Sequence, residues 1–191
     1  MRRDLLTSVI AVVVLTLVLG VAYPLAMTGI AQVAFPNKAN GSQLEIGGRV
    51  VGSKLIGQDF KGKPRYFQSR PSTATKYNAA ASAFTNLGPN SKDAAKTFKA
   101  NLAAYLKQNP GFTAAQVPID AVTSSASGID PQISVANARI QAHRVASARR
   151  LSLASVDKMI DKYTSGRFIG IFGEPAVNVL QLNLALDGVR Q

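Results

Sequence analysis

No charged side chain occurs between Asp4 and Lys38, and this uninterrupted run most constrains what the chain can fold into. Residues 5–22 are dense in Leu, Val and Ile, and the composition becomes mixed after Pro24. About 20 apolar residues in an α-helix span the hydrocarbon core of a bilayer. A buried helix of a soluble domain is disfavoured, because no charge interrupts the run on any face. The sequence therefore predicts one transmembrane helix.

The residues that flank the run predict its orientation. Arg2 and Arg3 precede it and should hold the N-terminus in the cytoplasm, and Tyr23 stands where an aromatic residue would meet the far interface. We therefore expect residues 1–36 to form a membrane anchor and residues 37–191 to form an α+β domain outside the cytoplasm.

A cleaved secretory signal is the alternative to an anchor. Gly29 and Ala31 have the spacing of a cleavage site before Gln32, but the apolar run exceeds the 7–15 residues of a usual signal core. The pair Arg2 and Arg3 resembles a twin-arginine signal, although the residues after it fit that pattern poorly. Cleavage would make the chain a secreted solute-binding or cell-surface module.

The composition excludes most classes of catalytic site. The chain has no cysteine and one histidine, His143, so zinc sites built on thiolates or on several imidazoles are excluded. Phosphate-binding, dinucleotide-binding and nucleophile-elbow motifs are missing. We expect no catalytic residue and no metal site, and a membrane-anchored hydrolase with His143 as its base remains the enzymatic alternative.

The charge indicates nucleic acid, anionic lipid or an acidic partner protein. The chain carries 22 Lys and Arg against 10 Asp and Glu, and Arg2, Arg3 and Asp4 alone precede Lys38. Between Asp59 and Asp93 basic residues alternate with aromatic ones, which in a soluble protein favours nucleic acid. Outside the cytoplasm nucleic acid is not expected, so the basic segment 61–76 should face an acidic partner surface or lipid.

Turn-forming residues and the spacing of apolar residues predict the remaining helices and strands. Glycines separate short strands at 44–46, 50–51 and 55–56. One helix is expected to start after Pro89, with Asn90 or Ser91 as its cap, and to end at Asn109-Pro110-Gly111. Two more are expected at about 134–150, with Ser134 as N-cap, and at about 153–163. Residues 117–134 indicate an ordered loop, and the alternation over 177–186 predicts a strand.

Several stretches match one family in order and spacing. They are GSKLIGQDF (52–60), YFQSRPS (66–72), YN (77–78), NLGP (86–89), SGIDPQIS (127–134), Gln141, RVA (144–146) and VNVLQLNLALD (177–187). Together with the N-terminal span, they resemble the C subunit of the Kdp potassium-transporting ATPase, a bacterial P-type pump complex. The chain departs from the family at Ile129, where Leu is usual, and at Gln132, where His is usual. It also has Ala83-Phe84-Thr85 where the family tends to have Gly-Gly-Ser.

The resemblance implies an accessory subunit in the bacterial inner membrane. Its helix would contact the lipid bilayer. Its protein partners would be the potassium-conducting and ATP-hydrolysing subunits, and it would help to assemble or stabilise their complex. It would also act as a catalytic chaperone that raises the ATP affinity of the pump subunit, so ATP is an implied ligand, whereas bound potassium is not expected here. The candidates for docking a partner are polar residues of the matching stretches: Arg70, Ser72, Asn78, Ser127, Asp130 and Arg144.

Overall fold

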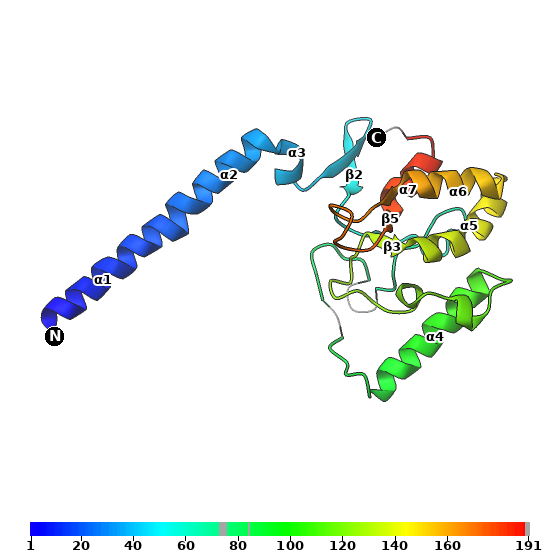
Figure 1. Ribbon diagram of the computed structural model, residues 1–191, viewed down its shortest axis with the longest axis horizontal. Coiled ribbons are helices and arrows are strands. Elements are labelled where there is room, and N and C mark those ends of the chain that lie inside the picture. The colour runs from blue at the N-terminus through cyan, green and yellow to red at the C-terminus, as the bar shows by residue number, and fades with distance from the viewer. Residues whose placement is uncertain (73–75, 84, 190–191) are drawn as a thin grey trace. The chain divides into compact units, whose positions relative to one another are not determined.

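The computed structural model describes residues 1–72, 76–83 and 85–189, and it divides into two compact units, Met1–Gln43 and Leu44–Gln191. The first unit is helical and the second mixes helices with two small sheets (Figure 1). The expected α+β class is therefore confirmed.

The N-terminal unit is one continuous apolar helix followed by a short helical turn. Segments α1 (Arg2–Leu17) and α2 (Tyr23–Ala34) are joined by the π-helical segment η1 (Val18–Ala22), and α3 (Pro36–Ala39) follows. Pro24 has no amide hydrogen and its ring crowds the preceding turn, so the widened π turn accommodates it without ending the helix. The helix continues to Ala34, beyond the apolar stretch that predicted the span.

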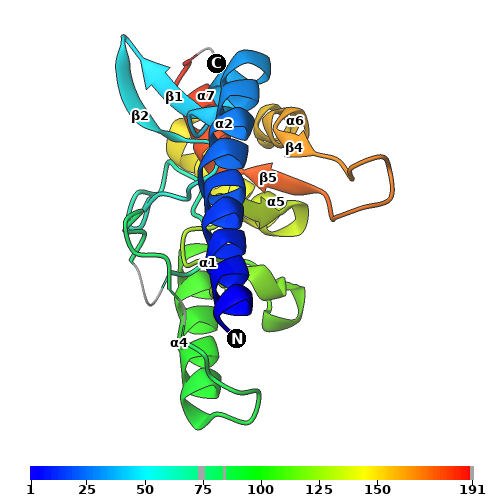
Figure 2. The same cartoon turned by 90° about the vertical axis from the view of Figure 1, so that its left-hand side faces the viewer.

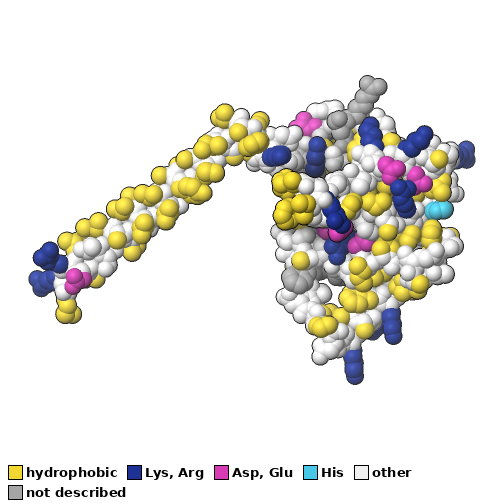
Figure 3. Space-filling model, in the orientation of Figure 1, with side chains coloured by type: hydrophobic (Ala, Val, Ile, Leu, Met, Phe, Trp, Pro, Cys, Tyr) yellow, Lys and Arg dark blue, Asp and Glu magenta, His cyan; other side chains and the backbone are white. Residues whose placement is uncertain are grey.

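This helix passes the requirements of a membrane span by length and composition. Arg2–Ala34 has a mean hydropathy of 2.8 in its most apolar window, and none of that window is buried within the protein. Figure 3 shows apolar side chains covering the helix on the visible face. The predicted single span is thus consistent with the structure.

Two small sheets lie in the second unit. Strands β1 (Gln43–Ile46) and β2 (Arg49–Ser53) form a hairpin whose Gly47 and Gly48 both have positive φ, as a two-residue type I′ turn requires. The other sheet has the order β3-β5-β4. Its strands are antiparallel and short: β3 (Gln132–Ser134), β5 (Ala176–Asn178) and β4 (Thr164–Ser165).

Three helices enclose the core together with this sheet. They are α5 (Val135–Arg149), α6 (Leu153–Lys162) and α7 (Val179–Leu186). Apolar residues that are fully or almost fully buried form one cluster: Phe67, Ile133, Ala138, Ala142, Val145, Ala146, Val156, Ile160, Val177, Val179 and Leu182. Helix α4 (Lys92–Gln108) buries little, with Ala94 its one buried residue.

The predicted helix starts are confirmed. Ser91 Oγ accepts from the Ala94 amide at 3.3 Å, and Ser134 Oγ accepts from the Asn137 amide at 3.1 Å. These are N-cap bonds, which satisfy amides that have no partner inside the helix. Helix α6 also begins and ends close to its predicted limits.

The predicted strand over 177–186 is wrong. Strand β5 stops at Asn178, whose Oδ1 accepts from the Gln181 amide at 3.1 Å and so starts α7. Val179, Leu182 and Leu186 then face the core at helical spacing.

Two further expectations need correction. Residues 55–56 form a turn instead of a third strand. The loop expected over 117–134 contains the short helix η3 (Ile119–Ala121), and its last three residues pair with β5 as β3.

Candidate functional site

Arg70 lies at the centre of a contact between two loops that are distant in the sequence. Its Nη1 forms an ion pair with Asp130 Oδ2 at 3.1 Å. Its Nη2 donates to the Ser124 carbonyl at 3.1 Å and to Thr123 Oγ1 at 3.4 Å. Both charged side chains are about three-quarters buried. A planar guanidinium with several donors suits this set of acceptors, so Arg70 fixes residues 123–130, here called the serine loop.

Ser72 and Tyr77 tie the same two loops together. Ser72 Oγ donates to the Gly128 carbonyl at 2.5 Å and accepts from the Tyr77 amide at 3.0 Å. The Tyr77 hydroxyl donates to the Arg70 carbonyl. Burial, with the negative charge of Asp59 adding to it, raises the pKa of Tyr77 well above its usual value, so this hydroxyl stays a donor.

A third segment reaches the serine loop at Gly57. The Gly57 amide donates to the Ile129 carbonyl at 2.7 Å. A Cβ at this position would lie 2.5 Å from the Asp130 carbonyl oxygen, a backbone atom that cannot rotate away. Only glycine fits this approach, and residues 57, 70–72 and 123–130 together form what we call the three-loop cluster.

The serine loop uses its own donors internally. Ser125 Oγ accepts from the Gly128 amide at 2.9 Å, and Ser127 Oγ accepts from the Ile129 amide at 3.2 Å. The two hydroxyl oxygens lie 3.3 Å apart. A phosphate-binding loop presents such amides to its ligand. Two amides of the serine loop are therefore already bonded within the loop.

Two buried amides hold the segment that leads to Arg70. Gln141 Oε1 accepts from the Gln68 amide at 2.8 Å, and its Nε2 donates to the Gln68 carbonyl at 3.1 Å. Asn183 pairs in the same way with the Phe67 amide and carbonyl, at 2.8 and 2.9 Å. Both side chains are almost completely buried. They form hydrogen bonds with backbone groups that are not paired with any strand. Buried polar groups require such partners.

Arg144 belongs to this second network. From α5, its Nη1 donates to the carbonyls of Pro64 and Tyr66 at 2.6 and 2.9 Å, and its Nη2 donates to Gln141 Oε1 at 2.9 Å. Its Nε donates to Asn109 Oδ1 at 3.2 Å. Burial lowers the pKa of Arg144. Arg144 thus positions residues 64–68.

The structure brings together most of the residues that the sequence proposed for docking. Four of the six lie in the three-loop cluster: Arg70, Ser72, Ser127 and Asp130. Asn78 makes a local turn, in which its Oδ1 accepts from the Ala80 amide at 3.0 Å. Arg144 lies in the other network. The departure from the family at Phe84 falls outside the described residues.

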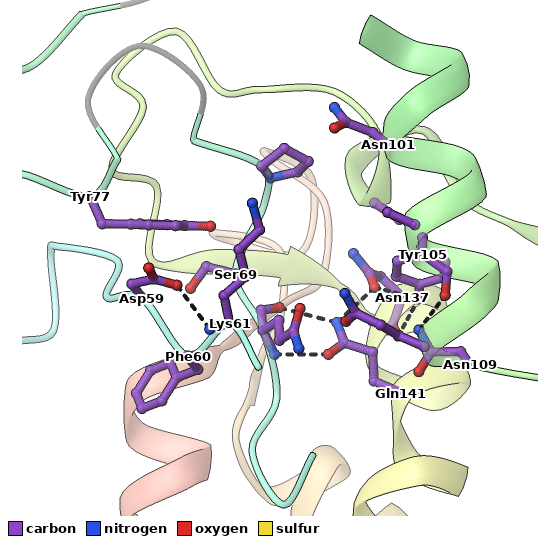
Figure 4. A pocket seen from close by; sticks show the side chains of 15 residues that line it. Asp59, Phe60, Lys61, Ser69, Tyr77, Asn101, Tyr105, Asn109, Asn137 and Gln141 are labelled. Carbon is purple, nitrogen blue, oxygen red and sulfur yellow. Dashed lines mark hydrogen bonds between the residues drawn. The ribbon is translucent and has the colours of Figure 1, made fainter. Parts of the chain in front are cut away.

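A small polar cavity lies beside the two networks (Figure 4). Its volume is about 90 Å³, and its lining includes Asp59, Ser69, Tyr77, Tyr105 and Gln141. Pockets for drug-sized ligands measure roughly 300–1,000 Å³, whereas polar cavities of this size suit ordered water. This cavity is therefore too small for a nucleotide, whereas wider and more open hollows of about 370 and 450 Å³ lie beside the serine loop and beside Arg144.

His143 does not form a catalytic pair in the described part of the chain. It is exposed on α5, and its ring packs edge-on against Phe112 with 5.2 Å between the centroids. Among the described residues no hydrogen bond joins it to a serine or a carboxylate. A serine hydrolase requires its histidine to contact both, so the hydrolase alternative gains no support.

Sequence reasoning missed two features. The sequence assigns no role to the buried amides Asn137, Gln141 and Asn183, although Gln141 and Asn183 belong to the features that match the family. The segment between β4 and β5 was not interpreted at all, although the run FIGIF at 168–172 between Arg167 and Glu174 is an apolar signal. In the structure its four large apolar side chains are exposed.

These features define the class of protein as an α+β unit with one N-terminal helix that could span a membrane. One apolar helix of spanning length is joined to a small α+β unit in which buried side chains hold polar loops in fixed positions.

The particular family follows from comparison with known proteins. A family model described as KdpC, the c chain of the K⁺-transporting ATPase, matches residues 5–188. The chain belongs to this family, whose members are accessory subunits of the K⁺-transporting ATPase. A potassium-transporting ATPase KdpC subunit from Methylibium petroleiphilum is 50% identical over 192 residues, which is 100% of both chains.

Other relatives carry the same name. The KdpC subunit of Mycobacterium tuberculosis strain H37Rv is 48% identical over 188 residues, which is 98% of this chain and 99% of the relative. The subunit from Koribacter versatilis is 44% identical over 191 residues, which is 100% and 97% of the two chains. The solute-binding and hydrolase alternatives are not supported.

Proposed function

We propose that the chain acts as a single-pass subunit of the bacterial cell membrane that docks on the potassium-conducting and ATP-hydrolysing subunits of the complex. The observation that carries the proposal is the family match over residues 5–188, which spans both the apolar helix and the α+β unit. Arg2 and Arg3 before the helix support a cytoplasmic N-terminus and an α+β unit outside the cytoplasm. Residues 1–36 and 37–191 are then the anchor and the outer domain.

We propose the three-loop cluster as one part of the docking surface. Its ion pair between Arg70 and Asp130 and its tightly bonded serine loop present a polar surface whose shape is fixed before binding. A surface that is ordered in advance loses less entropy on association. Arg144 and Asn78 would act indirectly, by positioning the neighbouring segments.

ATP and potassium are handled by the complex, and we propose that neither binds to this chain. The missing phosphate-binding motif and the internal bonding of the Gly128 and Ile129 amides support this for ATP. A rise in the ATP affinity of the pump subunit would then be indirect, through contact between subunits. ATP would add no chemistry on this chain.

The basic segment 61–76 is proposed to face an acidic partner surface. Lys61, Lys63 and Arg65 are exposed, and residues 73–75 lie outside the described part. A strongly basic unit beside a cation pathway would repel potassium unless its charge pointed away or was paired. Pairing with acidic groups of another subunit removes this conflict.

Replacing Lys61, Lys63 and Arg65 together by Gln is expected to lower the yield of the assembled complex most at low salt, and the difference from the native chain should shrink as salt is raised during purification. Salt screens the ion pairs at an interface, and the variant lacks the ion pairs that salt would weaken. The measurement is the amount of the other subunits that co-purifies with the tagged chain at increasing salt. The matched control replaces Lys96, Lys99 and Lys107, which are exposed on α4, by Gln. Equal yields from both triple variants would contradict the proposal.

The orientation has a direct test because the chain lacks cysteine. Ala103→Cys places one thiol on the exposed side of α4. We expect a membrane-impermeant maleimide to label this thiol fully in intact spheroplasts. Labelling that requires permeabilised membranes would place the α+β unit in the cytoplasm and overturn the orientation.

A further inference from the structure

An apolar tip projects from the sheet of the α+β unit. It consists of residues 168–172 in the connection between β4 and β5, which extends away from the body of the unit in Figure 2. Phe168, Ile169, Ile171 and Phe172 are 72%, 72%, 71% and 64% exposed. An aromatic side chain has roughly 150–250 Å² of surface, so the two Phe alone expose a few hundred Å². Apolar patches of that size on soluble surfaces are often functional.

The tip has a fixed geometry. The Phe168 amide donates to the Phe172 carbonyl at 2.8 Å, and the Phe172 amide donates to the Phe168 carbonyl at 3.0 Å. Ile169 has a φ of +52°, in the left-handed region that β-branched residues rarely adopt. Arg167 Nη2 contacts both carboxylate oxygens of Glu174 at 2.9 Å and closes the neck of the hairpin.

The charge of the neck favours a protein over a bilayer as the occupant. Arg167 and Glu174 balance each other, and the Glu174 side chain is 80% exposed. Segments that bind bilayer surfaces by charge carry several basic residues, and this neck has no net charge. A stiff hairpin also gains little in fluid lipid, whereas a pocket of defined shape rewards an apolar group that is already ordered. The family itself consists of subunits of an ATPase.

We propose that the apolar tip inserts into an apolar pocket on another subunit of the K⁺-transporting ATPase, with polar groups of that pocket's rim meeting Arg167 and Glu174. This inference rests on the proposed function, because it requires that the chain docks on other subunits. Binding sites of this kind concentrate their energy in a few buried aromatic residues surrounded by a polar rim.

Photo-cross-linking identifies the occupant. Phe172 is replaced by p-benzoylphenylalanine in the full-length chain, the membranes are irradiated, and the tagged products are analysed by mass spectrometry. We expect a covalent product with another subunit of the complex. A product with lipid, a product with a second copy of this chain, or no product in membranes that contain the complex would overturn the inference.

A pair of variants tests whether the contact matters for assembly. Phe168→Ser with Phe172→Ser is expected to weaken capture of the other subunits roughly tenfold or more, as the loss of aromatic anchors does at interfaces. Its thermal unfolding should match that of the native chain, because both side chains are exposed. Ile119→Ser with Leu55→Ser, at positions 72% and 60% exposed outside the hairpin, is the matched control.

The outcomes separate this inference from the proposed function. Capture by the native chain and the control variant but not by the Phe variant supports the tip as an anchor. Equal capture by all three chains, or equal loss in both variants, overturns the inference and leaves the subunit assignment standing. If the native chain captures no other subunit, the proposed function fails and the inference fails with it.

Discussion

Replacing Gly57 with alanine is expected to reduce the free energy of unfolding by about 1–3 kcal/mol, as overpacking of a tight contact does. The added Cβ would lie 2.5 Å from the Asp130 carbonyl oxygen, so the loops must separate. The hydrogen bond from the Gly57 amide to the Ile129 carbonyl would lengthen with them. Urea denaturation of the native and variant chains measures the difference.

Gly166→Ala is the control for this substitution. Gly166 has no atom within 4 Å of an added Cβ and no positive φ, so the change should stay within about 0.5 kcal/mol of the native stability. The Gly57 variant should also recover less of the assembled complex, because the serine loop is displaced. If both alanine variants unfolded at the same urea concentration, the close approach at Gly57 would be refuted.

Replacing Asn183 with leucine is expected to lower the free energy of unfolding by roughly 2–6 kcal/mol. The substitution leaves the buried Phe67 amide and carbonyl without their partners, and each unsatisfied buried group costs about 1–3 kcal/mol. Small domains are stable by about 5–15 kcal/mol, so this is a large fraction of the total. Asn86→Leu, at an exposed asparagine, should change the stability little.

The Asn183→Asp variant tests the same hydrogen bonds through the pH dependence of stability. A carboxylate at this position still accepts from the Phe67 amide but faces the Phe67 carbonyl, and it regains a donor when it is protonated. Its folded-state pKa should therefore be raised above the unfolded value of about 4, so its deficit should shrink as the pH falls from the raised pKa to about 4 and stay constant below that. A deficit that did not change with pH would contradict the pairing of Asn183 with the Phe67 carbonyl.

The helices were predictable because their start signals are local. Ser91 and Ser134 are capping residues placed directly before apolar residues at helical spacing, and both act as N-caps. The segment 177–186 was misread because its apolar residues alternate as they would in a strand. Two features favour the helix instead. The Asn178 side chain caps α7, and residues at both odd and even positions of the segment are buried.

The candidate site was predictable in composition but not in arrangement. The motifs that resemble the family contain Arg70, Ser72, Ser127 and Asp130, but nothing local tells that residues 70 and 130 meet. The same holds for Asn183 and Phe67, because an amide that pairs with distant backbone looks in sequence like any other amide. Contacts of this kind depend on the packing of the whole unit.

The apolar tip shows a different failure. Its sequence signal was available, since residues 168–172 carry four large apolar side chains around one glycine. Such a run predicts a buried strand as readily as an exposed hairpin. Its exposure became evident only from the positions of β4 and β5.

Purification of the tagged full-length chain in mild detergent, from its own host under potassium starvation, tests the central claim most directly. Mass spectrometry then identifies the proteins that accompany it. We predict that a multi-span potassium-conducting subunit and a phosphorylatable ATP-hydrolysing subunit co-purify with the intact chain. Recovery of this chain alone, shortened after Ala31, would contradict both the membrane anchor and the role as a subunit.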